Sequence, residues 1–378
     1  MILLDADKYK KKGFERAYFD EVYRYLCKNK KYKTMHAVGT DCVMKELVWC
    51  LKEYKLLQFL VSEEIQDKTF DKLSEDNFKD IMKALILADA GTLRKMYNYL
   101  RKPNSEYSEA RKVAKAVADR DQKNSQQESF NFMEYFGRNA YAGLRNLEIS
   151  VPQVDAVKGT IPMMMVRSLE VRTCPYCNRA FIGYAKNKNI GVQLDHFYNK
   201  SDYPLFAVSL YNLIPCCSSC NMNKSNKDEE KLISPFEEGY SFDQDLKFVF
   251  ERVQIGREGE ESQVIRELQL NVTAEDTKAR DRYKKNIDVF QLEASYEFHI
   301  TEAKKFYDKM QAYPPSLLRE IARHMTIPDE KGYMIERIPA DVLELGLFQE
   351  FFCEPADYLK KPLAKFYRDL YYKYRGWS

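Results

Sequence analysis

Residues 194–226 read LDHFYNKSDYPLFAVSLYNLIPCCSSCNMNKSN, which places an acid, an imidazole, several amides and a thiol pair within a short span. The histidine of this stretch is one of four in the whole chain. Two interpretations account for the mixture: a metal-dependent phosphodiesterase centre, or a structural zinc knuckle with polar surroundings. The patterns within and around the stretch bear on that choice.

The local pattern predicts a strand, a loop, a second strand and a helix. GVQLDH, at 191–196, alternates apolar and polar residues like a strand that ends in Asp195-His196, and LYNLIPC, at 210–216, is typical of another extended segment. The serines that begin SSCNMNKSNKDEE, at 218–230, suit the cap of a helix. We therefore expect the helix to follow the second strand directly.

Two C-x-x-C pairs enclose this unit: Cys174-Pro-Tyr-Cys177 and Cys217-Ser-Ser-Cys220. Four thiolates around one tetrahedral ion form a closed, structural zinc site. A gap of 39 residues separates the pairs, which is more than a simple zinc ribbon needs. Cys216 lacks the C-x-x-C spacing and is expected to be a small buried hydrophobe. The alternative is a redox pair, which the absence of a thioredoxin-like βαβ pattern disfavours.

The insert between the pairs contains groups that phosphodiester hydrolysis needs, namely a base and ligands for a divalent cation. His196 has the intrinsic pKa of a general base. An oxygen of Asp195 and an amide oxygen of Asn221 would suit Mg²⁺. Lys224 lies one helical turn after Asn221, so it would face the same way and could hold a phosphate. The plainer interpretation is a satisfied Asp-His pair with Asn221 as a cap or turn residue.

The combined pattern C-P-Y-C…L-D-H-F…Y-N-L-I-P-x-C-x-x-C-N-x-x-K, over about 174–226, resembles the HNH endonuclease superfamily in the subset braced by a four-cysteine zinc. This resemblance implies the ββα-metal fold. It also implies a role for each matching residue: His196 as general base, Asp195 and Asn221 as ligands of the catalytic metal, Asn212 as the residue that holds the histidine and the loop, and Lys224 as the basic residue that often follows.

The sequence departs from the name-giving pattern at its third position, where Asn221 replaces a histidine, and Ser225 stands four residues later. The departure favours Mg²⁺ or Mn²⁺ as the catalytic ion, beside the structural zinc. The resemblance implies that His196 deprotonates a water that attacks phosphorus in line, which leaves 5′-phosphate and 3′-hydroxyl ends.

The resemblance extends to the nuclease subunits of Septu-like antiphage defence systems, which work with an ATPase subunit. It implies an effector that nicks or cuts DNA, with double-stranded DNA as the expected substrate. The chain has no Walker A sequence, so an ATPase would have to be a partner. The competing hypothesis is a zinc-braced nucleic-acid-binding or adaptor subunit without catalysis. The oligomeric state is not indicated.

The sequence predicts an α+β chain that is mainly helical, with a central ββα-metal HNH module braced by the four-cysteine zinc and a β-hairpin after it. Residues 1–150 are expected to form a helical domain, residues 151–235 the nuclease module with its zinc knuckles, and residues 236–378 the hairpin and a helical region. The polar stretch DQKNSQQES, at 121–129, is the best candidate for an internal linker.

Periodicity places the flanking elements. Helical spacing of apolar residues covers 41–60, 77–100 and 109–121, with Thr40 or Asp41 as a plausible N-cap of the first. LKFVFERVQI and VIRELQLNV alternate on either side of GREGEES, which predicts a β-hairpin. From Asp276 the chain is expected to be helical. An apolar stripe there indicates one long helix that ends at Pro314-Pro315 and packs in a core; it comprises Ile287, Phe290, Tyr296, Ile300, Ala303, Phe306, Tyr307 and Met310.

Charge and hydropathy limit the class of protein. With 60 basic and 57 acidic residues the net charge is +3, so any contact with DNA must use a local patch. The basic and aromatic clusters at 8–19 and 360–377 either contact nucleic acid or are solvated helix faces. No apolar run reaches the ~20 residues that span a bilayer. The N-terminal residues lack the pattern of a secretory signal, so we expect a cytoplasmic protein without membrane contact.

Overall fold

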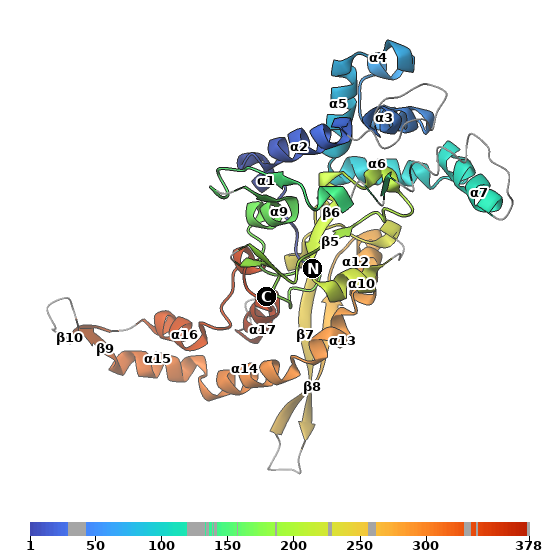
Figure 1. Cartoon of the computed structure of the whole chain (residues 1–378). Coiled ribbons are helices and arrows are strands. Elements are labelled where there is room, and N and C mark those ends of the chain that lie inside the picture. The colour runs from blue at the N-terminus through green and yellow to red at the C-terminus, as the bar shows by residue number, and fades with distance from the viewer. Residues whose placement is uncertain are drawn as a thin grey trace. The chain divides into compact units, whose positions relative to one another are not determined.

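The chain divides into two compact units in a computed structural model (Figure 1). Unit 1 comprises Met1, Leu3–Tyr176 and Ala180–Tyr240, and unit 2 comprises Ile2, Cys177–Arg179 and Ser241–Ser378. Helices predominate and the strands form small antiparallel sheets of two, so the expected α+β class is confirmed. The structure describes residues 1–28, 43–118, 133, 136–137, 139, 142–156, 158–185, 187–225, 229–255, 262–328, 334–337 and 339–375.

Helices make up most of the N-terminal half of unit 1. The expected helix over 77–100 is in fact two helices, because Asp89 accepts a hydrogen bond from the backbone N–H of Thr92 and so caps a new start. The 121–129 linker and the caps at 40–41 lie outside the described residues. The helices are α1 (Asp7–Lys11), α2 (Phe14–Lys28), α3 (Val43–Glu53), η1 (Leu56–Phe59), α4 (Glu63–Gln66), η2 (Phe70–Lys72), α5 (Glu75–Ile86), α6 (Ala90–Leu100) and α7 (Glu106–Ala118).

The remainder of unit 1 alternates short strands and helices. α9 (Ile161–Leu169) is apolar on most sides, and it contacts α1, α2 and β6, so it belongs to the core. Its neighbours are β1 (Glu148–Ile149), β2 (Gly159–Thr160), β3 (Gly183–Ala185), β4 (Lys188–Ile190), β5 (Gln193–His196), η3 (Pro204–Phe206), η4 (Leu210–Asn212), β6 (Leu213–Cys216), α10 (Ser218–Lys224) and η5 (Glu229–Lys231). The sheets pair β1 with β2, β3 with β4 and β5 with β6.

The basic and aromatic cluster at 8–19 is built into unit 1. Tyr9, Phe14 and Tyr18 are fully buried. Lys8 and Lys12 both form ion pairs with Glu170, at 2.9 and 2.6 Å. The rings therefore belong to the core, and two of the basic side chains of this cluster are neutralised within the protein.

Unit 2 contains the expected hairpin. β7 (Leu246–Ile255) pairs antiparallel with β8 (Ser262–Val272) and the two strands lie side by side, which confirms the prediction (Figure 1). Residues 256–261 of the expected loop are outside the described residues. The other elements are α11 (Phe242–Asp245), α12 (Thr277–Val289), α13 (Leu292–Glu297), α14 (Ile300–Ala312), α15 (Pro315–His324), β9 (Thr326–Pro328), β10 (Met334–Arg337), α16 (Ala340–Phe348), η6 (Pro355–Asp357) and α17 (Ala364–Arg375).

The prediction of a single long helix after Asp276 is wrong. Gln291 adopts a left-handed conformation with φ of 49°, which ends α12 and lets α13 begin in a new direction. A second interruption at residues 298–299 separates α13 from α14. The apolar stripe is nevertheless core, since all of its members except Ile300 are buried. The apolar pattern therefore predicted that these residues are buried, but it did not predict where the helices end.

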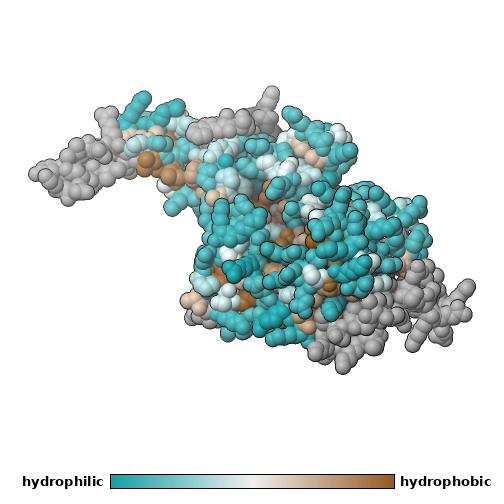
Figure 2. Space-filling view, turned by 90° about the horizontal axis from the view of Figure 1, so that it is seen from above, coloured by the Kyte–Doolittle hydropathy of each residue, from teal (hydrophilic) through white to brown (hydrophobic). Residues whose placement is uncertain are grey.

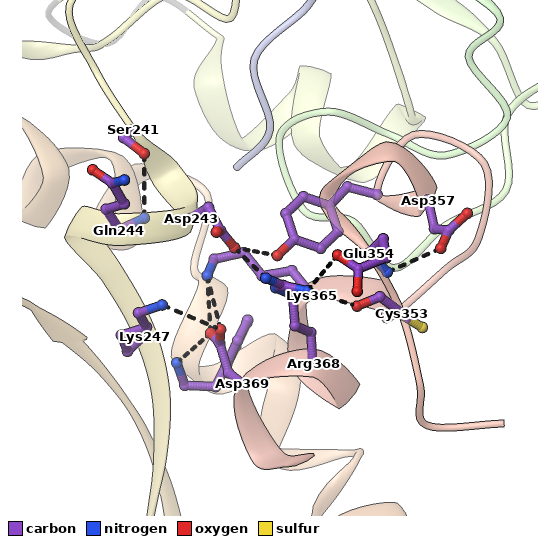
Figure 3. Close-up of polar contacts among 12 residues, drawn as sticks. Ser241, Asp243, Gln244, Lys247, Cys353, Glu354, Asp357, Lys365, Arg368 and Asp369 are labelled. Carbon is purple, nitrogen blue, oxygen red and sulfur yellow. Dashed lines mark hydrogen bonds and ion pairs between the residues drawn. The ribbon is translucent and has the colours of Figure 1, made fainter. Parts of the chain in front are cut away.

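The C-terminal basic and aromatic cluster, at 360–377, supplies a buried ion pair of unit 2 (Figure 3). Lys365 lies 2.9 Å from Oδ2 of Asp369, and neither side chain has more than 2% exposed surface. The same carboxylate accepts a hydrogen bond from the backbone N–H of Phe248 at 2.9 Å. Burial lowers the pKa of Lys365 and raises the pKa of Asp369. The charge of Lys365 is therefore paired with Asp369 inside unit 2 and is not offered at the surface.

One face of the molecule is mainly polar. The face shown in Figure 2 is dominated by hydrophilic residues, and hydrophobic residues gather only in limited areas of it. Within the described part of the chain, no helix has the length and apolar character needed to cross a membrane.

Candidate metal and hydrolytic site

An antiparallel strand pair followed directly by a helix forms the core of the candidate site. β5 and β6 pair in the register Gln193↔Cys216 to His196↔Leu213, and α10 contacts β5. The order strand, loop, strand and helix is the one that the sequence predicts. The strands are buried over nearly their whole length, so their ends hold the loop and α10 on a rigid base.

Asn212 fixes the loop between the two strands. Its side chain is fully buried, and its Oδ1 accepts a hydrogen bond from the backbone N–H of Tyr198 at 2.7 Å. Its Nδ2 donates to the carbonyls of Tyr198 and Phe206, at 3.1 and 3.0 Å. Its own carbonyl accepts from the N–H of Phe197 at 2.8 Å. A side chain with three hydrogen bonds to the loop backbone determines where that loop runs.

The four cysteines of the two C-x-x-C pairs come together. The sulfurs of Cys174, Cys177, Cys217 and Cys220 all lie within 4.8 Å of one another, and all four residues are buried. A tetrahedral zinc with Zn–S bonds of about 2.3 Å places its sulfurs about 3.8 Å apart, so the group fits such an ion. The backbone N–H of Cys217 also points to Sγ of Cys174 at 3.4 Å, which suits a thiolate. This buried group can hold a metal ion such as zinc.

Cys216 lies outside the group of four, as expected. It is fully buried, and burial raises the pKa of its thiol well above the ordinary value. A protonated thiol is a poor metal ligand, because the thiolate is the form that binds. Cys50 and Cys353 are also buried, whereas Cys42 lies outside the described residues.

His196 ends β5 with its ring held from one side. Nε2 lies 3.1 Å from the carbonyl oxygen of Ala207. A carbonyl can only accept, so Nε2 carries the proton in this contact and the lone pair is on Nδ1. Burial lowers the pKa of His196 to about 3, and the charges of Lys200 and Lys224 act in the same direction. The ring is therefore neutral at pH 7, with one nitrogen able to accept a proton.

Asp195 is held by two buried donors. Its Oδ2 accepts from the hydroxyl of Tyr176 at 2.7 Å, and its Oδ1 lies 3.1 Å from Nζ of Lys224. Tyr176 stands between the cysteines of the first C-x-x-C pair, so the same turn supplies two thiols and a donor to this carboxylate. The sequence pattern did not predict a role for Tyr176, because an aromatic residue within C-P-Y-C is typical of a core position.

The phosphate-binding role expected for Lys224 does not fit its position. Its side chain has no exposed surface, and its ammonium donates both to Asp195 and to the carbonyl of His196, at 3.1 and 2.9 Å. Lys224 does lie one helical turn after Asn221. It is the last residue of α10, however, and its ammonium contacts Asp195 and His196 of β5. It neutralises Asp195 from within the protein.

Asn221 lies at the surface of α10, where its Nδ2 donates to Oε1 of Gln193 at 2.7 Å. With Asp195 it borders a cleft of about 900 Å³. Carboxylate and amide oxygens at one cleft are the ligands that Mg²⁺ prefers, so the donor set fits such an ion in kind. The cleft is lined by Arg145, Asn146, Thr160, Pro162, Tyr184, Asn187, Asn189, Val192, Gln193, Leu194, Asp195, His196, Asn199, Lys200, Asn221, Met222 and Ser225.

The structure thus brings Asp195, His196 and Asn221 to one cleft, whereas Asn212 and Lys224 are fully buried and do not line it. No family model matches the chain, and neither the curated proteins nor the solved structures that were compared contain a match.

Proposed function

We propose that this chain is a metal-dependent endonuclease of the HNH type, which hydrolyses phosphodiester bonds in DNA by nicking or by cutting both strands. The observation that carries the proposal is the placement of His196. Its Nε2 is committed to the Ala207 carbonyl, and the residue lines the same cleft as Asp195 and Asn221. The four-cysteine group and the loop held by Asn212 support it, because both fix the strand that ends in His196.

The proposed chemistry uses His196 as the base. Nδ1 accepts a proton from water while Nε2 remains bound to the carbonyl of Ala207, so the ring does not need to turn. The resulting hydroxide attacks phosphorus in line, the bond to the 3′ oxygen breaks, and that oxygen takes up a proton from solvent. The products carry 5′-phosphate and 3′-hydroxyl ends. Asp195 and Asn221 would hold a Mg²⁺ or Mn²⁺ ion, which supplies neutralisation of charge on the phosphoryl and leaving oxygens.

The biological role follows from the resemblance alone. We propose that the substrate is double-stranded DNA and that the chain is the effector of a bacterial antiphage system in the cytoplasm. An ATPase subunit would then be a partner, because the sequence has no Walker A pattern. The rival function, a zinc-braced nucleic-acid-binding or adaptor subunit, would keep the four-cysteine group and lack hydrolysis.

The test is cleavage of supercoiled plasmid in the presence of Mg²⁺ or Mn²⁺. We expect the wild type to produce nicked or linear DNA with 5′-phosphate ends. His196→Ala should cleave at a rate lower by about 100-fold or more, as is usual when a general base is removed. His324→Ala is the matched control, since His324 is exposed on α15 and does not line this cleft. Equal cleavage by the wild type and His196→Ala would favour the adaptor function.

A further inference from the structure

The cleft beside His196 has two cations that the sequence pattern does not single out. Arg145 comes from the segment before β1, and Lys200 from the loop between β5 and β6. Both line the cleft together with Asp195, His196 and Asn221. Arg145 is exposed and Lys200 is half-buried. The cleft therefore has a positively charged part next to the proposed base.

The backbone around Lys200 is fixed. The neighbouring Asn199 accepts hydrogen bonds from the N–H groups of Ser201 and Tyr203, at 2.9 and 2.7 Å. On the other side, the carbonyl of Lys200 lies only 2.8 Å from the position that a Cβ would take at Gly137. A glycine at 137 permits this close approach. The side chain of Lys200 therefore starts from a defined position at the cleft.

The two cations act on each other. Burial lowers the pKa of Lys200, and the charge of Arg145 lowers it further. Two positive charges that oppose each other at a half-buried site attract an anion, because an anion between them relieves the repulsion. Lys224 cannot serve this purpose, since its side chain is completely buried.

We propose that Lys200 and Arg145 bind the phosphodiester backbone in this cleft, and that they are the positioning residues for the scissile phosphate. The inference deepens the proposed nuclease function and rests on it for the claim that the bound phosphate is the one that is cleaved. The binding itself does not require hydrolysis. The guanidinium of Arg145 can contact two phosphate oxygens, and Lys200 adds a point charge in the same cleft.

The test separates binding from cleavage. A fluorescent DNA duplex is titrated with protein at several salt concentrations, without chelator and without added Mg²⁺ or Mn²⁺, so that the four-cysteine group keeps its metal. The proteins compared are wild type, Lys200→Gln, Arg145→Gln and His196→Ala. Lys95→Gln is the matched control, because Lys95 is exposed on α6 and does not line the cleft. Removal of each cation should weaken binding several-fold and reduce the slope of log K against log salt by about 1. Lys200→Arg should restore both values.

The outcomes for the two proposals differ. Loss of binding in Lys200→Gln and Arg145→Gln, with normal binding by His196→Ala, supports the inference even if no variant cleaves DNA. Cleavage by wild type together with an unchanged salt slope in both cation variants overturns the inference and leaves the nuclease function standing. Wild type that fails to bind the duplex also overturns it. Circular dichroism of each variant excludes unfolding as the cause of a loss.

Discussion

The ammonium of Lys224 lies 3.1 Å from Oδ1 of Asp195, and the two side chains expose 0% and 6% of their surface. The pair connects the end of α10 to the end of β5, and Lys224 also bonds the carbonyl of His196. It therefore joins the helix of the candidate site to the strand that carries its proposed base. Removal of one partner from a buried pair is strongly destabilising, because the other charge is left buried alone.

The first prediction follows from that pair. Lys224→Met should lower the free energy of unfolding by about 3 kcal/mol or more, because it leaves the Asp195 carboxylate buried without its counter-charge. Lys95→Met, at an exposed site on α6, should change stability by less than about 0.5 kcal/mol. Urea unfolding of the two variants and the wild type measures the difference. If Lys224→Met were as stable as Lys95→Met but failed to bind DNA, the phosphate role first expected for Lys224 would be restored.

The second prediction concerns the metal held by the four cysteines. The purified protein should contain one tightly bound zinc, and Cys174→Ser should lose it and unfold at lower temperature. Cys216→Ala is the control, since Cys216 is buried next to Cys217 but lies outside the group. Metal analysis and thermal unfolding of both variants provide the readouts. Retention of zinc by Cys174→Ser, or its loss from Cys216→Ala, would show that the ligand set is different.

Much of the site could be predicted from the sequence because its signals are local. Strand alternation, the C-x-x-C spacing and the hairpin at 246–272 each depend on neighbouring residues, and each element formed as expected. The extent of burial could not be predicted in this way. Helical spacing places Lys224 one turn after Asn221. The burial of Lys224 depends on the contact between α10 and β5, which is a tertiary contact that local spacing does not predict.

The missed residues share a physical cause. Tyr176 lies within the first C-x-x-C pair, and its hydroxyl donates to Asp195, which is 19 residues away in the sequence and is brought close only by tertiary structure. Arg145 lies about 50 residues before Asp195 in the sequence, so no local pattern joins them. The first break in the predicted long helix occurs at Gln291, which adopts a left-handed conformation. A glutamine in the sequence does not predict that conformation.

The third prediction tests the loop anchor. Asn212→Ala should lower the free energy of unfolding by about 3 kcal/mol, because it removes three hydrogen bonds from backbone groups of the loop, at the N–H and carbonyl of Tyr198 and the carbonyl of Phe206. Asn98→Ala, at an exposed position on α6, serves as the control and should be nearly neutral. Hydrogen exchange of the Tyr198 amide adds a local readout, and we expect it to accelerate in Asn212→Ala alone. Unchanged protection there would mean that other contacts hold the loop.

The fourth prediction is a dependence of stability on pH at Glu170. Hydrogen bonds from Lys12 and Lys8 lower the pKa of Glu170 from 4.5 to about 2. Because the folded pKa is depressed, the stabilisation is complete above about pH 4.5 and is lost as the pH falls toward 2. The carboxylate is 47% exposed, so its contribution should not exceed about 1 kcal/mol. Glu170→Gln should therefore be less stable than wild type at pH 7, and the difference in urea midpoint should shrink between pH 4.5 and pH 2. Glu238→Gln, at an exposed position, should show no such convergence. A Glu170→Gln deficit that stayed constant with pH would mean that its contacts stabilise without depending on charge.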